Sequence, residues 1–440
     1  MDKSTKQIKN ILAMINWRLY KALLFMGLCP TIYTTIRTFL IGQMPGEWAY
    51  SIAGQLSWVN LIYEVANEAI ILPLFYFMGS VVEDREEFTN RLRTGISLSA
   101  KLYVSFSAVL MIFAVPLLRY MAASPDIIKE SATYIRIESI AYIFCILYNF
   151  SLVALITINK SQAVYVLTIC KLIITVLSDI FLISQMPISL KLGINGIGIS
   201  NIITNMLLFA FCIWILKKNG YSIWGKTQKS NKWMRGLLRI GGMSGLESFV
   251  RNIAYMLMVA RMINIVNEQG VYWVANNFIW GWLLLPVTQL AELIKQEVST
   301  DPKSVKKKSS GWFALTGLIC MFWIICIPLY TPFIKYVLGY SDTEKLFTLV
   351  LVMLIPYIAY AVQNVCDATF YGAGRTDYML LESVATNSIY YGCAFILYKM
   401  GVWTPSLLGI ALLFGFGNIF DTIVTWLIYR HYLKTQTEEI

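Results

Sequence analysis

Twelve long apolar segments constrain this chain more than any other feature of its sequence. Each is long enough, as a helix, to cross the roughly 30 Å hydrocarbon core of a bilayer. They run approximately over residues 18–42, 52–79, 95–118, 132–158, 163–184, 193–216, 236–263, 270–295, 311–334, 345–373, 378–400 and 405–430. Of all residues 57% are hydrophobic and 14% are charged, whereas a soluble domain has about 45–50% and about 25%. The sequence therefore predicts an all-α polytopic membrane protein.

Basic residues are concentrated in alternate connections between these spans. The amino-terminal segment and the loops after the second, sixth and eighth spans hold most of the lysines and arginines, including four lysines between residues 303 and 308. Basic loops stay in the cytoplasm by the positive-inside rule. We therefore expect a multi-pass protein of a bacterial plasma (inner) membrane with both termini cytoplasmic. The net charge of +11 is explained by this topology, so nucleic acid is not an expected partner.

The chain repeats its plan after the longest polar connection, residues 217–239. AYSIAGQLSWVNLI, from Ala49, aligns without gaps with VYWVANNFIWGWLL, from Val271. Matched pairs are Tyr50 and Tyr272, Trp58 and Trp280, and, further on, Asn201 and Asn418. Each half has an even number of spans, so the two halves are expected to be parallel repeats about an axis along the membrane normal. The prediction is an N-terminal six-helix bundle over residues 1–220, a cytoplasmic linker over 221–235 and a C-terminal six-helix bundle over 236–440.

Several classes of chemistry find no support in the sequence. The eight cysteines all lie in apolar spans without a CxxC pair, and the single histidine, His431, lies at the end of the last span. Neither a zinc site nor a disulfide framework is predicted from this pattern. No nucleophile–base spacing and no phosphate-binding loop are present either. We therefore expect a protein that is not an enzyme, binds no metal or organic cofactor and draws energy from an ion gradient.

Acidic and amide side chains inside the spans are candidates for binding a coupling cation or proton. A charged group at membrane depth is unfavourable, so it usually faces a partner or a wet cavity. The candidates are Asp179 and Asn201 in spans 5 and 6, Glu64 and Glu68 in span 2, and Asp367 in span 10. A hydrogen bond between packed helices is the alternative for Asp179 and Asn201. A cap on a broken helix is the alternative for Asp367.

Arg37 in span 1 limits what these acids can do. An ion pair between Arg37 and either Glu64 or Glu68 on the adjoining helix is expected. One arginine cannot neutralise all the acids of this half, so at least one acid is expected to bind a proton reversibly. On this basis Asp179→Asn should lose gradient-driven transport, whereas Arg37→Ala should lower the protein yield.

A second set of residues is predicted to line a substrate cleft. The set comprises Arg37, Trp58, Glu247, Arg251, Trp280 and Asn364. Glu247 and Arg251 are four residues apart and can simply pair along one helix face. If Arg37 and Arg251 both face the cleft, they form a positive clamp for an anionic group. The two tryptophans can hold flat or cationic substrates, although core packing is the preferred explanation for them.

Several stretches of the sequence resemble one transporter family. They are TIRTFLIGQMPGEWAYSIAG at the end of span 1, SDIFLIS and LGINGIGISNIIT in spans 5 and 6, and DATFYGAGRT in span 10. In order and spacing they are similar to the multidrug and toxic compound extrusion (MATE) family, within the wider multidrug/oligosaccharidyl-lipid/polysaccharide flippase superfamily. The resemblance implies a V-shaped protein of twelve transmembrane helices in two pseudo-symmetric bundles. It also implies export of organic compounds by alternating access, in exchange for Na⁺ or H⁺.

The same resemblance implies roles for particular residues. The family's acidic position in span 5, polar position in span 6 and acidic position in span 10 match Asp179, Asn201 and Asp367. Arg37 and Arg251 stand where the family often has carboxylates. This departure motivates an alternative function, a flippase for a lipid-linked anionic oligosaccharide or polysaccharide precursor. In both cases the expected partners are the lipid bilayer and a small amphiphilic or charged substrate, and a monomer is expected.

Overall fold

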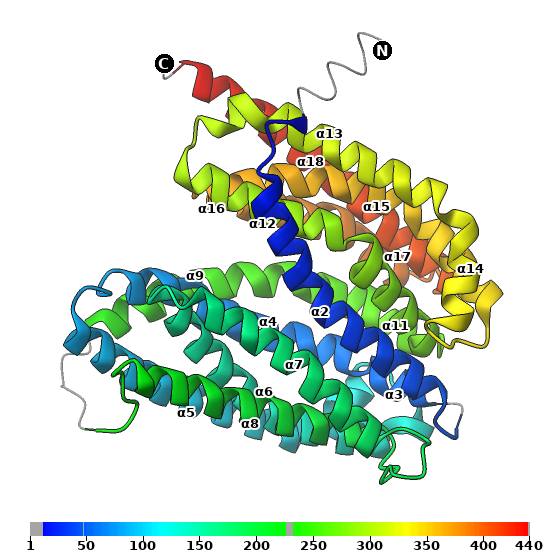
Figure 1. Ribbon diagram of the computed structural model, residues 1–440. Coiled ribbons are helices and arrows are strands. Elements are labelled where there is room, and N and C mark those ends of the chain that lie inside the picture. Colours follow the sequence, from blue (N-terminus) through cyan, green and yellow to red (C-terminus); the bar gives the residue numbers. More distant parts are fainter. Residues whose placement is uncertain (1–11, 47, 226–231, 439–440) are drawn as a thin grey trace. The chain divides into compact units, whose positions relative to one another are not determined.

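The computed structural model describes residues 12–46, 48–225 and 232–438, and every regular element in these ranges is a helix (Figure 1). The first elements are α2 (Trp17–Gly42), α3 (Ala49–Gly54), α4 (Leu56–Gly79), α5 (Arg85–Tyr120), α6 (Pro125–Thr157), α7 (Ser161–Leu182), α8 (Ile194–Lys218), α9 (Lys232–Tyr255), the π-helix η1 (Met256–Ala260) and α10 (Arg261–Ile265). The later elements are α11 (Gln269–Phe278), the π-helix η2 (Ile279–Leu283), α12 (Leu285–Thr300), α13 (Ser304–Ile325), α14 (Ile327–Tyr336), α15 (Thr343–Gly372), α16 (Thr376–Ala385), the π-helix η3 (Thr386–Tyr391), α17 (Gly392–Lys399) and α18 (Leu407–Glu438).

Each predicted span coincides with one helix or with a run of consecutive helices. Within the described residues, eight single helices are long and apolar enough to cross a membrane, and the pair Gln269–Leu283 and Leu285–Thr300, bent by 53°, makes a ninth. The seventh, eighth and eleventh spans each contain a π-helix, which widens the helix by one residue and often marks a functional position. The predicted all-α membrane class is confirmed.

The chain packs as two compact units, one over residues 36–273 and one that joins the described residues up to Thr35 to residues 274–438. The seventh span, from α9 to α10, therefore packs with the helices that precede it. The beginning of α2 packs with the later helices. These units describe packing, whereas the bundles predicted over 1–220 and 236–440 describe internal repetition, and that division stays a prediction.

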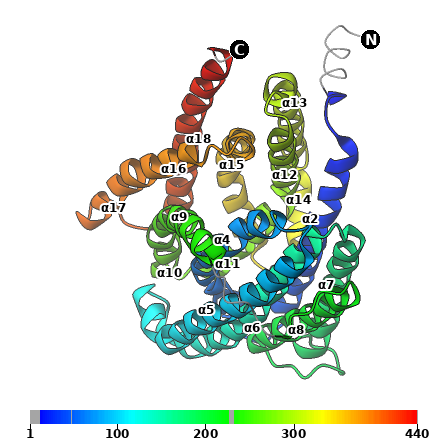
Figure 2. The ribbon, with the colours of Figure 1, turned by 90° about the vertical axis from the view of Figure 1, so that its left-hand side faces the viewer.

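In the first of these units α6 packs between α5 and α8, and α4 packs against α9 (Figures 1 and 2). Gly241 on α9 makes the second contact possible. A Cβ atom added at Gly241 would stand 1.8 Å from the carbonyl oxygen of Ala69 on α4. Only a residue without a side chain allows two helix backbones to approach this closely.

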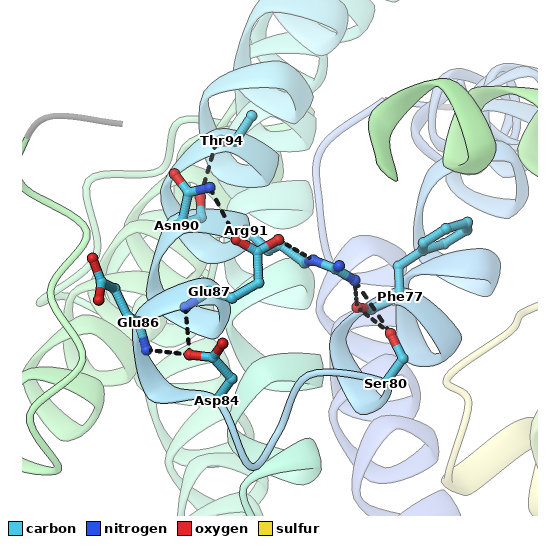
Figure 3. Close-up of polar contacts among 8 residues, drawn as sticks. All are labelled: Phe77, Ser80, Asp84, Glu86, Glu87, Asn90, Arg91 and Thr94. Carbon is cyan, nitrogen blue, oxygen red and sulfur yellow. Dashed lines mark hydrogen bonds and ion pairs between the residues drawn. The ribbon is translucent and has the colours of Figure 1, made fainter. Parts of the chain in front are cut away.

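Polar contacts at the start of α5 define where this helix begins (Figure 3). The Asp84 carboxylate accepts hydrogen bonds from the backbone N–H groups of Glu86 and Glu87, at 3.1 and 3.0 Å. Arg91 lies one turn after Glu87 and donates to its carboxylate at 2.8 Å and to the carbonyl oxygen of Phe77 at 2.6 Å. Asp84 therefore caps α5, and Arg91 joins the first turns of this helix to the end of α4.

The other unit is organised around α15, which packs against α12, α13, α14, α16 and α18. Its core is aromatic: Trp312, Phe370 and Tyr429 are fully buried. The beginning of α2 belongs to this core through Tyr20, whose hydroxyl group donates to the carbonyl oxygen of Pro286 at 2.9 Å. That carbonyl lies at the bend between η2 and α12, so Tyr20 supports a backbone group near an interrupted helix.

Candidate functional site

Arg37 on α2 and Asp179 on α7 form a two-pronged ion pair. The Arg37 Nε and Nη2 groups donate to the two carboxylate oxygens of Asp179 at 2.7 and 3.0 Å. The Asp179 side chain is fully buried and that of Arg37 is 13% exposed. This planar, bidentate geometry is the strongest form of arginine–carboxylate pairing. It fixes both side chains and neutralises the charge of Asp179.

Asn201 on α8 contacts a carboxylate that the sequence analysis did not single out. Its amide nitrogen donates to Glu138 Oε1 on α6 at 2.7 Å. Glu138 is 2% exposed, and both Arg37 and Asp179 lie close enough to act on its charge. The predicted residues Asp179 and Asn201 therefore do lie in one neighbourhood, with Glu138 between them. We call Arg37, Glu138, Asp179 and Asn201 the arginine cluster.

The prediction that Arg37 pairs with Glu64 or Glu68 is wrong. Those two acids instead contact Arg251 on α9, whose Nη2 lies 2.7 Å from Glu68 Oε1 and 3.4 Å from Glu64 Oε1. The exposed fractions of these side chains are 33% for Arg251, 43% for Glu64 and 22% for Glu68. The physical reason is the close approach of α4 and α9 at Gly241, which brings the acids of span 2 against span 7.

The roles predicted for Glu247 and Asn364 stay predictions. Glu247 belongs to α9, but its side chain lies outside the described part of the structure, so its pairing with Arg251 stays a prediction. Asn364 is half-buried on α15. Its role in a substrate cleft also stays a prediction.

The two predicted cleft tryptophans differ in their surroundings. Trp58 is 1% exposed in the core of its unit, and its indole N–H donates to Gln55 Oε1 at 3.1 Å. This burial agrees with the packing explanation. Trp280 on η2 is 44% exposed, and its indole N–H donates to the Tyr357 hydroxyl group at 3.1 Å. Trp280 and Tyr360, with ring centroids 5.6 Å apart, leave an aromatic surface that can meet a flat molecule.

A second polar cluster joins α15, α16 and α18, around the buried amide of Gln363. The Gln363 amide nitrogen donates to Glu382 Oε1 at 3.0 Å and to Asp421 Oδ2 at 2.8 Å. The Thr386 hydroxyl group, at the start of η3, donates to the other Asp421 oxygen at 2.6 Å. One amide thus holds two carboxyl groups from different helices, and the π-helix begins at a residue that contacts one of them.

The charges of this second cluster are all negative. Glu382 is 4% exposed, and Asp367, one turn after Gln363 on α15, lies close enough to act on its charge. No Lys or Arg within the described ranges lies at ion-pair distance from Glu382 or Asp421. We call Gln363, Asp367, Glu382, Thr386 and Asp421 the acidic cluster. Of its members only Asp367 was a sequence candidate.

The sequence signal that marked the predicted residues, an acid within an apolar span, also marks Glu138, Glu382 and Asp421. Each is a single acid within an apolar span, in RIESIAY, LLESVAT and NIFDTIV. A charge at membrane depth marks a functional position wherever it occurs. Applying that rule to spans 4, 11 and 12, as it was applied to spans 2 and 5, would have found all three.

The arrangement of donors limits what the acidic cluster can bind. In the part of the chain that the structure covers, no group of three or more His, Cys, Asp or Glu side chains is arranged to hold a metal ion. The N–H groups of Gln363 already point at the two carboxylates. Na⁺ needs several oxygen ligands directed at one point, whereas a proton needs a single carboxyl oxygen. The geometry therefore suits proton binding better than a cage for a cation.

Comparisons with known proteins agree with this architecture. The MatE family model matches residues 82–181, which cover α5, α6 and most of α7. A solved structure described as the inward-facing conformation of a multidrug resistance MATE family transporter of the MOP superfamily is similar over 93% of this chain and 95% of that chain, with 17% identity and a TM-score of 0.78. The outward-facing conformation of such a transporter is similar over 98% and 97%, with 15% identity and a TM-score of 0.65.

A third structure, a MATE protein in a bent conformation, is similar over 96% of both chains, with 17% identity and a TM-score of 0.65. No curated protein matches the chain in a sequence search. The family resemblance predicted from the sequence is confirmed by the matched region and by the matched architecture together. Residues 82–181 match the MatE family model, and the fold of the chain is similar to that of solved MATE transporters.

Proposed function

We propose that the protein is a MATE-like secondary exporter that expels organic compounds by alternating access in exchange for protons, and that the acidic cluster carries the proton. The single observation behind the assignment of the site is the contrast in neutralisation. Asp179 is held by two hydrogen bonds from Arg37. Glu382 and Asp421 share only the neutral amide of Gln363. Two carboxyl groups around one donor can take up and release a proton as a unit.

Coupling requires that the proton bind one conformation better than another. A ligand shifts a conformational equilibrium only through its different affinity for the two states. The acidic cluster joins three helices, and Thr386 begins the π-helix η3 in one of them. Protonation of Asp421 changes the hydrogen-bond acceptors that are available to the Thr386 hydroxyl group and the Gln363 amide group. The proposal is that this change alters the path of α16 and α18 and so couples proton uptake to movement of the unit.

The acidic cluster is a poorer binding site for Na⁺, the other coupling ion that the family resemblance implies. Its acids surround an amide donor, which repels a cation at the same point. No resident cofactor and no chemical step on the substrate are part of the proposal. The membrane is proposed to be a bacterial plasma membrane, with both termini on its cytoplasmic side.

The flippase alternative is not favoured. It was motivated by Arg37 and Arg251 as a clamp for an anionic group. In the structure Arg37 is engaged by Asp179, and Arg251 contacts Glu64 and Glu68. An arginine that already faces carboxylates attracts a further anion much less strongly.

An efflux assay in a bacterium that lacks its own multidrug pumps tests the proposal. Expression of the protein should lower the accumulation of a cationic fluorescent dye, and a protonophore should abolish the effect. A sodium ionophore should leave efflux unchanged. The proposal fails if expression changes neither dye accumulation nor drug resistance, or if only collapse of the sodium gradient stops efflux. Substitutions in the acidic cluster then locate the proton site.

A further inference from the structure

A basic pocket lies at the end of the α5–α6 hairpin. It has a volume of about 610 Å³ and is lined by the end of α5 and the first turns of α6. Three of its lining residues are cations, Arg119, Lys129 and Arg136, and all three are exposed. By the predicted topology this end of the hairpin lies on the non-cytoplasmic side, where the positive-inside rule makes clustered cations uncommon.

The positive charge of this pocket is not cancelled by ion pairs. None of the three cations forms an ion pair with a residue in the described ranges. The neighbouring acids Asp126 and Glu130 are exposed and do not line the pocket. Polar protein cavities with several uncompensated donors bind anions.

The three cations are placed at different depths along the hairpin. Lys129 and Arg136 are seven residues apart on α6 and share one helix face, while Arg119 stands at the end of α5. Arg136 is eleven residues after Pro125, about 16 Å along the helix. Its Nε group donates to the carbonyl oxygen of Met111 on α5 at 3.2 Å. That bond holds the guanidinium group between the helices and leaves its other N–H groups available.

Apolar surface continues from the pocket along α5. Val109, Ile112 and Phe113 are 52%, 70% and 51% exposed, at the spacing of one helix face. In a membrane-spanning helix such a face contacts acyl chains. A molecule with an anionic head and apolar tails fits a site that is basic at one end and apolar beyond it.

We propose that this pocket binds a phosphate-bearing group, and that the source of the group is the headgroup of an anionic phospholipid. Arg119 and Arg136 contact the phosphate oxygens, Lys129 adds positive charge at the rim, and the acyl chains follow the exposed face of α5. Arginine is suited to this role because its planar donors match phosphate geometry. The α5–α6 hairpin is thereby a lipid-binding element of the transporter.

The test measures lipid binding to the full chain in neutral detergent by native mass spectrometry. Phosphatidylglycerol is titrated against wild-type protein and the variant Arg119→Gln/Arg136→Gln, with phosphatidylcholine as the lipid without net charge. The matched control is Lys335→Gln/Lys399→Gln, which removes the same charge from exposed positions on the same predicted side of the membrane. We expect one phosphatidylglycerol site whose affinity falls by about 30-fold in the arginine variant and is unchanged in the control.

Inorganic phosphate is the second probe and distinguishes the two sources of the anion. If phosphate displaces the lipid, free phosphate compounds share the site. If it does not, the acyl chains are needed and the ligand is a lipid. Lys129→Gln alone should weaken binding by about fivefold, which keeps the test valid should the double variant fold poorly. Equal affinity of wild type and the pocket variants for both probes, or an equal loss in the control, would overturn the proposal.

Discussion

The arginine cluster and the acidic cluster are built from matching spans of the predicted repeat, but only the first contains an arginine. The arginine cluster uses spans 4, 5 and 6, with Arg37 reaching in from span 1. The acidic cluster uses spans 10, 11 and 12. The corresponding arginine of span 7, Arg251, turns instead to Glu64 and Glu68 on α4. In the first cluster Arg37 therefore neutralises Asp179, while Glu138 accepts from the Asn201 amide. In the second, Glu382 and Asp421 share an uncharged amide.

Because of this difference, we assign a structural role to the Arg37–Asp179 ion pair and the proposed coupling role to the acidic cluster. Two fixed opposite charges in a buried bidentate pair hold helices together but have little reason to exchange a proton, because releasing either partner leaves the other charge buried and unpaired. Acids that share a neutral donor have no such constraint. The placement of Arg37 thus argues against Asp179 as the proposed coupling site.

Giving the acidic cluster an arginine should have the largest effect on transport. In Gln363→Arg a permanent positive charge replaces the amide between Glu382 and Asp421 and opposes their protonation. Proton-driven transport into inverted vesicles should fall to the level of vesicles without the protein, with normal membrane insertion. Gln363→Met, which removes the donor without adding charge, is the control and should retain part of the activity. Wild-type transport by Gln363→Arg would show that the two clusters are not distinguished by charge.

Removing the arginine from the arginine cluster should have the largest effect on stability. Arg37→Gln leaves Asp179 fully buried without its cation, and breaking a buried ion pair in this way destabilises by about 3–5 kcal/mol. The measurement is the unfolding temperature in detergent, followed by tryptophan fluorescence, together with the yield of inserted protein. An unfolding temperature equal to that of wild type would mean that the pair does not stabilise the fold.

The same substitution at Arg251 should have a smaller effect on stability. Arg251 and its two acids are one-fifth to two-fifths exposed, whereas Asp179 is fully buried, so Arg251→Gln should lower stability by less than the roughly 3 kcal/mol expected for breaking a buried pair. The same thermal measurement, made side by side with Arg37→Gln, checks this. A loss as large as that of Arg37→Gln would erase the distinction between the two arginines.

The smallest expected effect lies at the start of α5. Asp84→Ala removes the cap that accepts from the N–H groups of Glu86 and Glu87 (Figure 3), and loss of such a cap is worth about 1 kcal/mol. Because this site is remote from both clusters along the chain, the proton dependence of transport should be unchanged. A changed proton dependence in Asp84→Ala would mean that general loss of stability mimics loss of coupling.

Hydropathy made the spans predictable, because a helix that crosses a bilayer must be apolar over its whole length. The pairing of Arg37 was not predictable in this way. The expectation rested on consecutive helices being neighbours, which favoured Glu64 and Glu68 of span 2, yet Arg37 reaches α7. Which helix face meets which is a property of the packed fold and leaves no trace in a single sequence.

The acidic cluster shows a different limit. Its acids were visible as charges within apolar spans, but only the structure shows that Gln363 holds Glu382 and Asp421 together. Asp179 was a candidate both as an acid within a span and through the family resemblance, and its neutralisation by Arg37 moves the proposed coupling site to the other unit. A candidate found by its position in a motif still needs its neighbours before its role can be assigned.

Proton-driven uptake of dye into inverted vesicles tests the central claim most directly, when the Arg37–Asp179 ion pair and the two acids around Gln363 are each made uncharged in turn. Arg37→Met/Asp179→Leu removes both charges of the ion pair and replaces them with apolar groups of similar size, a change that is often neutral for stability. Glu382→Gln/Asp421→Asn removes the acids around Gln363 while keeping their shape. Normalised to inserted protein, the first variant should keep its response to the pH gradient and the second should lose it. Loss of the response in the first variant with its retention in the second would contradict the account.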